Sequence, residues 1–533
     1  MKHLWWPNKQ WYDSQRENVL FNCPSSGGRY HVEEVDVFGQ SKIITFLKRR
    51  TPPGVESRKK LRTISIPDTS LELGNIDSFT PHLKNVISPR HSKVKYMHRL
   101  NRKSNLTINL LFIPASVLMI GESAFRKSRL KYIIFARNSQ IGFLGAAAFF
   151  FTKRLRSVQI PSSVHTLGMD IFQSSKLKSI SIPSTSKLKI IPECSFDDCL
   201  DLSSFTIPAA VERIEREAFN VAGLQSITFP NSHLRYIGMF SFYFSPHLTV
   251  IKFPATLEII SDYAFSRSSC QSITFAPNSH LEKIGIRSFQ YSDLVSIEIP
   301  SSVREISESA FYKSSLTSIC FGLNSKLVNL SAKIFKGCSN LISIEIPSSI
   351  KEISEQAFMD SGIESITFAP NSCLTLISRC AFYRSQLMSI RIPSSVEVLG
   401  TCVLSESKIS SVTFMPNSKL TKISNRAFQN CSLLASIVFP STLKIIGDYA
   451  FENCPSLTCL EIPSSVEEIG NYAFAGLNVK SIVFSPDSIL RKIGKGAFGR
   501  CPLLETINIP LSVETNNFMD FFDSQPGSEN SKN

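Results

Sequence analysis

The apolar and polar positions of this chain follow one pattern that repeats from residue 61 to residue 522. Ile297 and Ile299 are apolar residues two positions apart, and the same alternation returns 22 residues later at Ile319. Apolar residues at a spacing of two predict a strand with one buried face. Further apolar residues follow at a wider spacing and lead to Phe311. The pattern therefore predicts one coil of chain per copy, with a strand at its start.

The first apolar residue of each expected strand marks twenty copies, spaced 22 to 25 residues apart. A period in this range is typical of a solenoid. Because one coil cannot bury its apolar edge alone, its stability must come from contacts with the coils on either side. The markers are Ile64, Val86, Leu111, Ile133, Val158, Ile180, Phe205, Ile227, Ile251, Ile273, Ile297, Ile319, Ile344, Ile366, Ile390, Val412, Ile437, Leu460, Ile482 and Ile507.

The copies come in two lengths, which mostly alternate along the chain. The short form reads Ile-x-Ile-Pro-Ser-Ser-Val and advances 22 or 23 residues, whereas the long form reads Ile-Thr-Phe-Ala-Pro-Asn-Ser-x-Leu and advances 24 or 25. Proline cannot donate a hydrogen bond to a strand ladder, so each strand is expected to end there. The alternation indicates duplication of a two-repeat unit.

One position of the repeat is nearly always Phe, with Leu404 and Arg102 as the departures. A short helix or 3₁₀ turn is expected at this position, and the rings should form a column along the stack. The column accounts for much of the count of 39 Phe residues. Its members are Phe125, Phe149, Phe172, Phe196, Phe219, Phe242, Phe265, Phe289, Phe311, Phe335, Phe358, Phe382, Phe428, Phe451, Phe474 and Phe498.

The residue sequence of the repeat resembles that of a known class of repeats. Residues 462–474 read Ile-Pro-Ser-Ser-Val-Glu-Glu-Ile-Gly-Asn-Tyr-Ala-Phe, and residues 451–457 read Phe-Glu-Asn-Cys-Pro-Ser-Leu. Both are similar to BspA-like leucine-rich repeats, which occur in adhesin-like proteins of mucosal bacteria and in surface antigens of parasitic protists. The resemblance implies a scaffold that binds proteins or host surfaces. It brings no catalytic residues.

The predicted fold is an α/β repeat, a leucine-rich repeat solenoid of about 20 repeats. One parallel sheet is expected on the concave face, with short helical or 3₁₀ turns opposite. Residues 1–60 are expected to form an N-terminal cap or linker that is basic and contains all three tryptophans. Residues 61–523 form the solenoid. Residues 524–533 contain no apolar residue and are expected to be disordered.

Positive charge is concentrated near the start of the chain. Residues 1–104 hold 19 Lys and Arg but 9 Asp and Glu, so about +10 of the net +15 lies there. The segment 48–62 carries two basic clusters around Pro-Pro-Gly, which is consistent with a nuclear-import signal, an anion-binding patch or a solvated linker. No zinc spacing, helix-turn-helix pattern or aromatic interleaving accompanies it, so nucleic-acid binding is disfavoured.

Neither a signal peptide nor a membrane span is expected. Charged and polar residues interrupt the first apolar stretch, and the longest uncharged runs fall in the register of the repeat. The sequence by itself therefore favours a cytoplasmic location, whereas the family resemblance would allow the cell surface.

The residues that could carry chemistry are scattered. The thirteen cysteines include no Cys-x-x-Cys, and no histidine accompanies them at the spacing of metal ligands. Five cysteines occupy the position three residues after the column Phe, which favours buried free thiols. No catalytic triad, paired-carboxylate motif or phosphate loop is present. We therefore expect no enzyme activity, cofactor, metal or small-molecule substrate.

The exposed face of the strands is the candidate binding surface. The residue before each marker is Ser in 13 of 20 copies, which fits close packing of neighbouring coils as well as recognition. The residue after the marker is charged in several short copies: Lys252, Glu298, Glu345, Arg391 and Glu461. Packing does not require alternating charge at that position, so these five residues are predicted to contact a protein partner. The alternative is an intracellular scaffold or regulator with nuclear or nucleic-acid association through residues 48–62.

Overall fold

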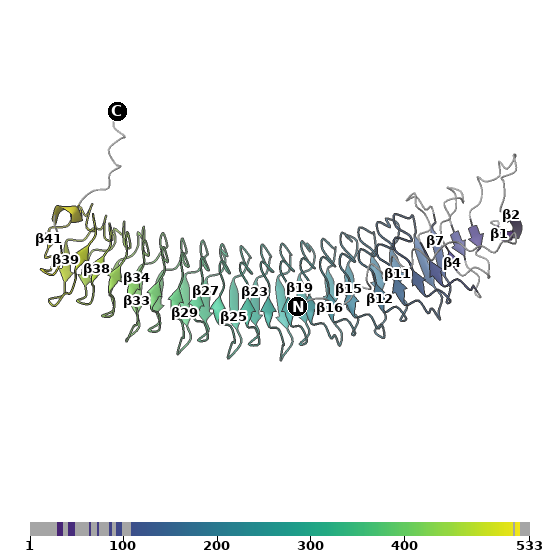
Figure 1. Cartoon of the computed structure of the whole chain (residues 1–533), viewed down its shortest axis with the longest axis horizontal. Coiled ribbons are helices and arrows are strands. Elements are labelled where there is room, and N and C mark those ends of the chain that lie inside the picture. The colour runs from purple at the N-terminus through teal and green to yellow at the C-terminus, as the bar shows by residue number, and fades with distance from the viewer. Residues whose placement is uncertain are drawn as a thin grey trace, which may run out of the picture.

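A computed structural model describes residues 92–98, 108–514 and 518–522, together with the backbone of five strands before them. The chain forms a long, gently curved stack of coils (Figure 1). Each of the twenty markers falls within a strand, so the predicted solenoid and its register are confirmed. Most of the predicted cap, the segment 48–62 and the tail 524–533 lie outside the described residues.

Most coils contribute one longer and one shorter strand, and the two kinds form two sets of parallel ladders. The predicted single sheet is therefore one of two. The longer strands, here called the long-strand sheet, are β3 (Thr63–Ser65), β5 (Asn85–Ile87), β7 (Leu110–Ile113), β9 (Tyr132–Phe135), β11 (Ser157–Gln159), β13 (Ser179–Ser181), β15 (Ser204–Thr206), β17 (Ser226–Thr228), β19 (Val250–Phe253), β21 (Ser272–Phe275), β23 (Ser296–Ile299), β25 (Ser318–Phe321), β27 (Ser343–Ile346), β29 (Ser365–Phe368), β31 (Ser389–Ile392), β33 (Ser411–Phe414), β35 (Ser436–Ile437), β37 (Leu460–Ile462), β39 (Ser481–Phe484) and β41 (Thr506–Ile507).

The second set, here called the short-strand sheet, consists of two-residue strands whose second side chain is buried wherever the side chains are described. Its members are β4 (Glu72–Leu73), β6 (Tyr96–Met97), β8 (Met119–Ile120), β10 (Phe143–Leu144), β12 (Thr166–Leu167), β14 (Ile190–Ile191), β16 (Arg213–Ile214), β18 (Tyr236–Ile237), β20 (Ile259–Ile260), β22 (Lys283–Ile284), β24 (Glu305–Ile306), β26 (Asn329–Leu330), β28 (Glu352–Ile353), β30 (Leu376–Ile377), β32 (Val398–Leu399), β34 (Lys422–Ile423), β36 (Ile445–Ile446), β38 (Glu468–Ile469) and β40 (Lys492–Ile493).

Three further elements lie at the two ends of the chain. Near the N-terminus, β1 (Arg29–Val35) and β2 (Ser41–Leu47) pair as an antiparallel hairpin. After the last coil comes a 3₁₀ helix, η2 (Phe518–Phe522). Its Asp520 and Phe521 carbonyls accept hydrogen bonds from Gly496 and Phe498, at 2.6 and 2.9 Å. The helix thus occupies the place of a further coil, as expected of a C-terminal cap.

The turn around the column Phe, here called the Phe turn, is not a helix. Of the predicted short helix or 3₁₀ turn it has only i→i−3 hydrogen bonds, from Tyr312 to Ser309 and from Ser314 to Phe311, both at 3.0 Å. In the coil of Phe311, Ser309 and Lys313 have φ angles of 58° and 50°. Left-handed residues on both sides of Phe311 direct the N–H groups of 309, 311 and 313 onto carbonyls of the next coil, at 2.9–3.1 Å. Satisfying these donors between coils replaces the i→i−4 bonds of a helix.

The column of rings is confirmed. Consecutive column rings stack nearly parallel, with centroids 4.9 to 6.0 Å apart from Phe125 to Phe382 and from Phe428 to Phe498. Leu404 fills the gap between the two runs and is buried. Arg102 lies outside the described residues.

The Pro-Ser-Ser turns hold neighbouring coils together through the second Ser. Ser302 and Ser349 donate hydrogen bonds to the carbonyls of Leu281 and Leu327 in the preceding coil, both at 2.7 Å. Ser395 and Ser465 repeat the contact, and Thr fills the same role at two other positions. These hydroxyls are therefore structural.

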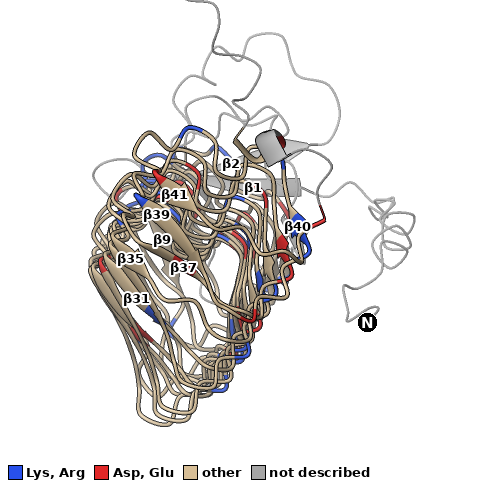
Figure 2. Ribbon diagram, turned by 90° about the vertical axis from the view of Figure 1, so that its left-hand side faces the viewer, with Lys and Arg blue, Asp and Glu red and all other residues tan. Residues whose placement is uncertain are grey.

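The placement of a sheet on the concave face is not confirmed. In Figure 1 η2 lies at the edge toward the inside of the curve, and its hydrogen bonds join it to the last Phe turn. The Phe turns therefore run along the inner edge. In Figure 2 the long-strand sheet lies along one flank of the stack.

Candidate interaction surface

The five charged residues predicted as partner contacts all lie on the long-strand sheet, in β19, β23, β27, β31 and β37. Lys252, Glu298, Glu345, Arg391 and Glu461 each directly follow a buried marker and are exposed to solvent. Because side chains alternate along a strand, burial of the marker turns its neighbour outward. The structure thus brings the five predicted residues onto one face, in one column.

Small or uncharged residues separate the charges along this column. The registered neighbour of Glu298 is Cys320, and that of Glu345 is Thr367. At about 4.8 Å per strand, consecutive charges from Lys252 to Arg391 are therefore roughly 10 Å apart. This spacing keeps Glu298 from repelling Glu345 strongly at physiological ionic strength.

None of the five side chains forms an ion pair with another described residue. The turn before the short-strand sheet and that sheet itself differ in this respect, because several carboxylates there pair with a cation of a neighbouring coil. Lys283 lies 2.8 Å from Glu305, and Arg235 lies 2.5 Å from Glu258. Lys189 and Lys444 pair in the same way with Glu212 and Glu467. Figure 2 shows these blue and red segments along the side that carries β40.

The ion pairs also affect protonation. A hydrogen bond from Lys189 and the charge of Lys189 hold the pKa of Glu212 below its ordinary value. Burial alone would raise the pKa of Glu305, but hydrogen bonds from Lys283 and Ser307 outweigh it and lower the pKa. The paired charges on the short-strand side therefore serve contacts within the stack, whereas the five charges on the long-strand sheet remain available to a partner.

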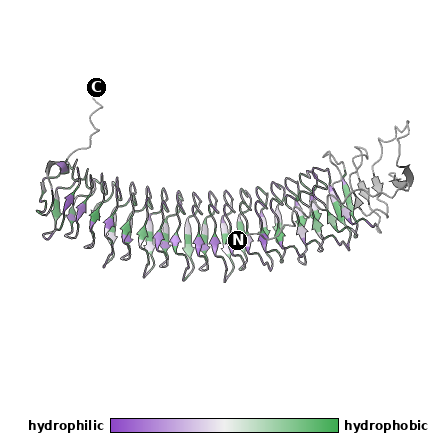
Figure 3. Ribbon diagram, in the orientation of Figure 1, coloured by the Kyte–Doolittle hydropathy of each residue, from purple (hydrophilic) through white to green (hydrophobic). Residues whose placement is uncertain are grey.

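Strands of the stack mix hydrophobic and hydrophilic residues (Figure 3), and apolar side chains at the ends of the long strands are also exposed. Val438 is 79% exposed, and Ile342 and Met388 are about half exposed. Interfaces typically combine apolar contacts with a polar, charged rim. The face thus has the mixed composition that suits a protein partner.

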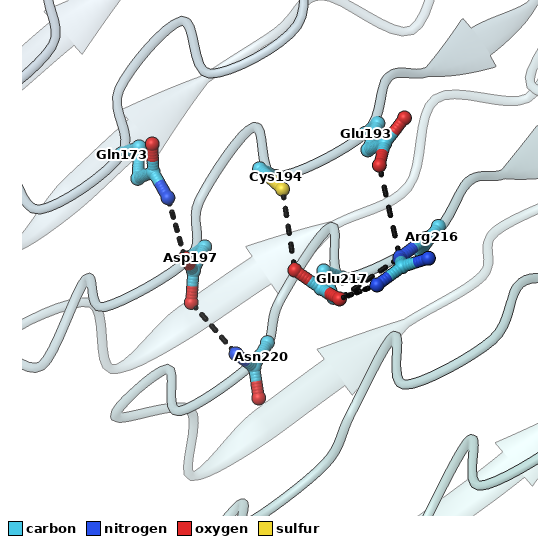
Figure 4. Close-up of polar contacts among 7 residues, drawn as sticks. All are labelled: Gln173, Glu193, Cys194, Asp197, Arg216, Glu217 and Asn220. Carbon is cyan, nitrogen blue, oxygen red and sulfur yellow. Dashed lines mark hydrogen bonds and ion pairs between the residues drawn. The ribbon is translucent and has the colours of Figure 1, made fainter.

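A second group of polar contacts lies on the Phe turns near the N-terminal third of the stack (Figure 4). Asp197 accepts hydrogen bonds from Gln173 at 2.6 Å and from Asn220 at 2.9 Å. Beside it, Cys194 donates to Glu217, which pairs with Arg216. The hydrogen-bonded partners are 23 or 24 positions apart and occupy equivalent positions of successive coils. Aligning the repeats and comparing the residues at each position would therefore have found the group.

This group shows no sign of reactivity. Burial raises the pKa of the Cys194 thiol, and the nearby Glu217 carboxylate raises it further, so Cys194 is not an activated nucleophile. Burial also raises the pKa of Asp197, against the hydrogen bonds from its two amide partners. Within the described part of the chain, no cluster of three or more His, Cys, Asp or Glu side chains could hold a metal ion.

A shallow hollow of about 690 Å³ lies at the C-terminal end, between the last coil and η2. Phe498, Leu504 and Phe522 are among the residues that line it. Its Arg500 is held by Glu452, and burial raises the pKa of its Cys501. The hollow is a gap at the end of the stack, lined by both apolar and polar residues. Across the described residues, no helix has the length and apolar character needed to cross a bilayer.

Comparison with protein families agrees with the geometry. A model of the BspA type leucine-rich repeat region matches residues 101–222, 212–332, 305–433 and 408–525. The chain belongs to this family. The matched segments span most of the BspA-type solenoid described above, and they include the column Phe of every coil from Phe125 onward. A comparison with curated protein sequences found no match.

Several solved structures resemble the chain at low identity. A leucine-rich repeat protein from Bacteroides ovatus is 22% identical over 76% of this chain and 88% of its own, with a TM-score of 0.48. The pneumococcal vaccine antigen PcpA is 22% identical over 62% and 84%, with a TM-score of 0.40. A leucine-rich cell surface protein from Faecalibacterium prausnitzii is 16% identical over 95% and 100%, with a TM-score of 0.23.

Proposed function

We propose that this BspA-type solenoid is a non-catalytic, adhesin-like protein that recognises a protein partner through its long-strand sheet. One observation carries the proposal. Lys252, Glu298, Glu345, Arg391 and Glu461 form an exposed column without ion pairs among the described residues, whereas four ion pairs join neighbouring coils on the short-strand side.

Ion pairs on the surface contribute little to stability and satisfy each other's charge within the stack. Exposed charges without a partner contribute little to the fold, so a regular column of them is available for a role outside it. In an interface they would steer association and set specificity for a partner of complementary charge.

The dimensions of the column suit a globular partner. From Glu298 in β23 to Glu461 in β37 the column spans seven steps between neighbouring strands, or roughly 35 Å at the strand spacing. A standard interface buries about 800 Å² on each partner. A single domain could therefore contact four of the five charges at once.

The test is a pull-down from host and self lysates with the full chain and two variants. Glu298→Lys with Glu345→Lys reverses two charges of the column and should remove the captured partner. Glu282→Lys with Glu397→Lys is the matched control, because both residues are exposed, form no ion pair with a described residue and lie beside the short-strand sheet. Equal capture by both variants would contradict the proposal.

A further inference from the structure

A strip of rings and cations crosses four successive Phe turns in the middle of the stack. The rings are Phe240, Tyr243, Phe244, Tyr263, Tyr291 and Tyr312, and the cations are Arg267, Arg287 and Lys313. Phe244 is 48% exposed and Tyr291 is 38% exposed, so the strip presents aromatic surface to solvent. We call it the aromatic–cationic strip.

The cations of the strip rest on rings and not on carboxylates. Arg267 lies 5.1 Å from the centroid of Tyr291, and Lys313 lies 5.6 Å from that of Tyr312. Arg287 lies over Tyr263 and donates a hydrogen bond of 2.6 Å to its hydroxyl. A ring face attracts a cation but leaves its full positive charge in place. These three charges have no ion pair among the described residues.

Several cations of other Phe turns form ion pairs instead. Arg216 pairs with Glu217 at 2.6 Å, and Lys333 pairs with Glu308 at 2.8 Å. Arg384 pairs with Glu406 at 2.7 Å. The strip thus gathers three cations without ion pairs, and the rings beside them, on four successive Phe turns.

We propose that the aromatic–cationic strip is a second binding surface, which takes an acidic polypeptide segment. Tyr and Arg are the side chains that dominate binding energy at protein interfaces. Guanidinium groups bind carboxylates through paired, charge-assisted hydrogen bonds, and the exposed rings would contact apolar side chains of the same segment.

The carboxylates at the border of the strip favour a polypeptide over a polyanion. Asp262 accepts a hydrogen bond from the backbone N–H of Ile286, and Glu308 lies beside Lys333. A nucleic-acid strand carries one phosphate about every 3.4 Å and would place charge against both carboxylates. A peptide with a few separated carboxylates avoids them. The proposal is independent of the long-strand sheet, which lies on a flank of the stack (Figure 2).

The experiment measures binding of a fluorescent random copolymer of L-glutamate and L-tyrosine to the full chain at two salt concentrations. Arg267→Gln with Arg287→Gln should weaken binding about tenfold or more, because each variant residue removes a charge-assisted contact. Arg426→Gln is the matched control. Arg426 holds the same slot as Arg287 and lies 5.2 Å from the centroid of Tyr449, but outside the strip. It should change the affinity less than about twofold.

Lys313→Gln provides a second variant in case the double variant fails to fold, and it should also weaken binding. Glu298→Gln with Glu345→Gln should leave copolymer binding unchanged, which separates this proposal from the one for the long-strand sheet. Equal affinities for the strip variants and the Arg426 control would overturn the inference. So would a copolymer that does not bind, or preferential binding of heparin or a single-stranded oligothymidylate.

Discussion

The ring of Phe311 stacks on the ring of Phe289, with centroids 5.5 Å apart and planes inclined by 8°. Phe335 covers the other side at 5.7 Å, so Phe311 has no contact with solvent. Offset rings at this separation add stabilisation beyond their buried area. The column therefore couples each coil to both neighbours.

Replacing Phe311 by Ala should leave a cavity between two rings that cannot close. We expect the free energy of unfolding to fall by about 3–5 kcal/mol in urea denaturation. Lys326→Ala alters an exposed turn residue of the next coil and should cost under about 0.5 kcal/mol. Similar losses of unfolding free energy in the two variants would mean that the column of rings does not stabilise the stack.

The fold could be predicted because every coil must bury apolar side chains at the same positions of the repeat. The markers and the Phe column are fixed by what one stacked coil needs, so twenty imperfect copies report the same register. The geometry of the Phe turn could not be predicted from the same pattern. Residues such as Lys313 give no signal of a left-handed conformation, which arises from hydrogen bonds to the next coil.

The candidate sites divide in the same way. The column from Lys252 to Glu461 was visible because one strand position alternates between charged and small residues. The aromatic–cationic strip was missed because Tyr263, Arg287 and Lys313 occupy two different slots of three coils. Its rings and cations also resemble ordinary surface variation until the coils are stacked. Only the stacked structure shows that the cations of the strip form no ion pair with a described carboxylate.

The short-strand ion pairs should contribute a small pH-dependent stability. The contact with Lys189 lowers the pKa of Glu212 in the folded chain, so the stabilisation is present above the ordinary Glu pKa. It is lost as the pH falls through the lowered folded value. Glu212→Gln should therefore reduce stability at pH 7 by under about 0.5 kcal/mol, because the pair is exposed.

Urea denaturation of the wild type and of Glu212→Gln at pH 7 and pH 3 measures this effect. The difference between the two proteins should shrink on acidification, because the carboxylate becomes protonated in the folded chain as well as in the unfolded chain. A difference that grows on acidification would contradict the ion-pair account.

The cysteines should react with iodoacetamide in two classes. Cys320, Cys373 and Cys459 are exposed and should be alkylated in the folded chain. Burial raises the pKa of the Cys199 and Cys270 thiols to about 12 and that of Cys338 to about 11, which suppresses the reactive thiolate at pH 8.

Mass spectrometry of the alkylated chain checks these assignments. All thirteen thiols should be modified after unfolding without reductant, because the twelve described cysteines are free. Early modification of the buried thiols, or thiols that react only after reduction, would contradict the described packing.

The most direct test of the central claim is the association rate of the captured partner with purified chains at low and high salt. Reversal of Glu298 and Glu345 to Lys should leave the unfolding midpoint unchanged. It should also change the association rate about tenfold or more at low salt and much less at high salt. Reversal of Glu282 and Glu397 should have little effect at either salt concentration. If the control reversal changes the rate and the long-strand reversal does not, the partner binds elsewhere and the proposed recognition face is wrong.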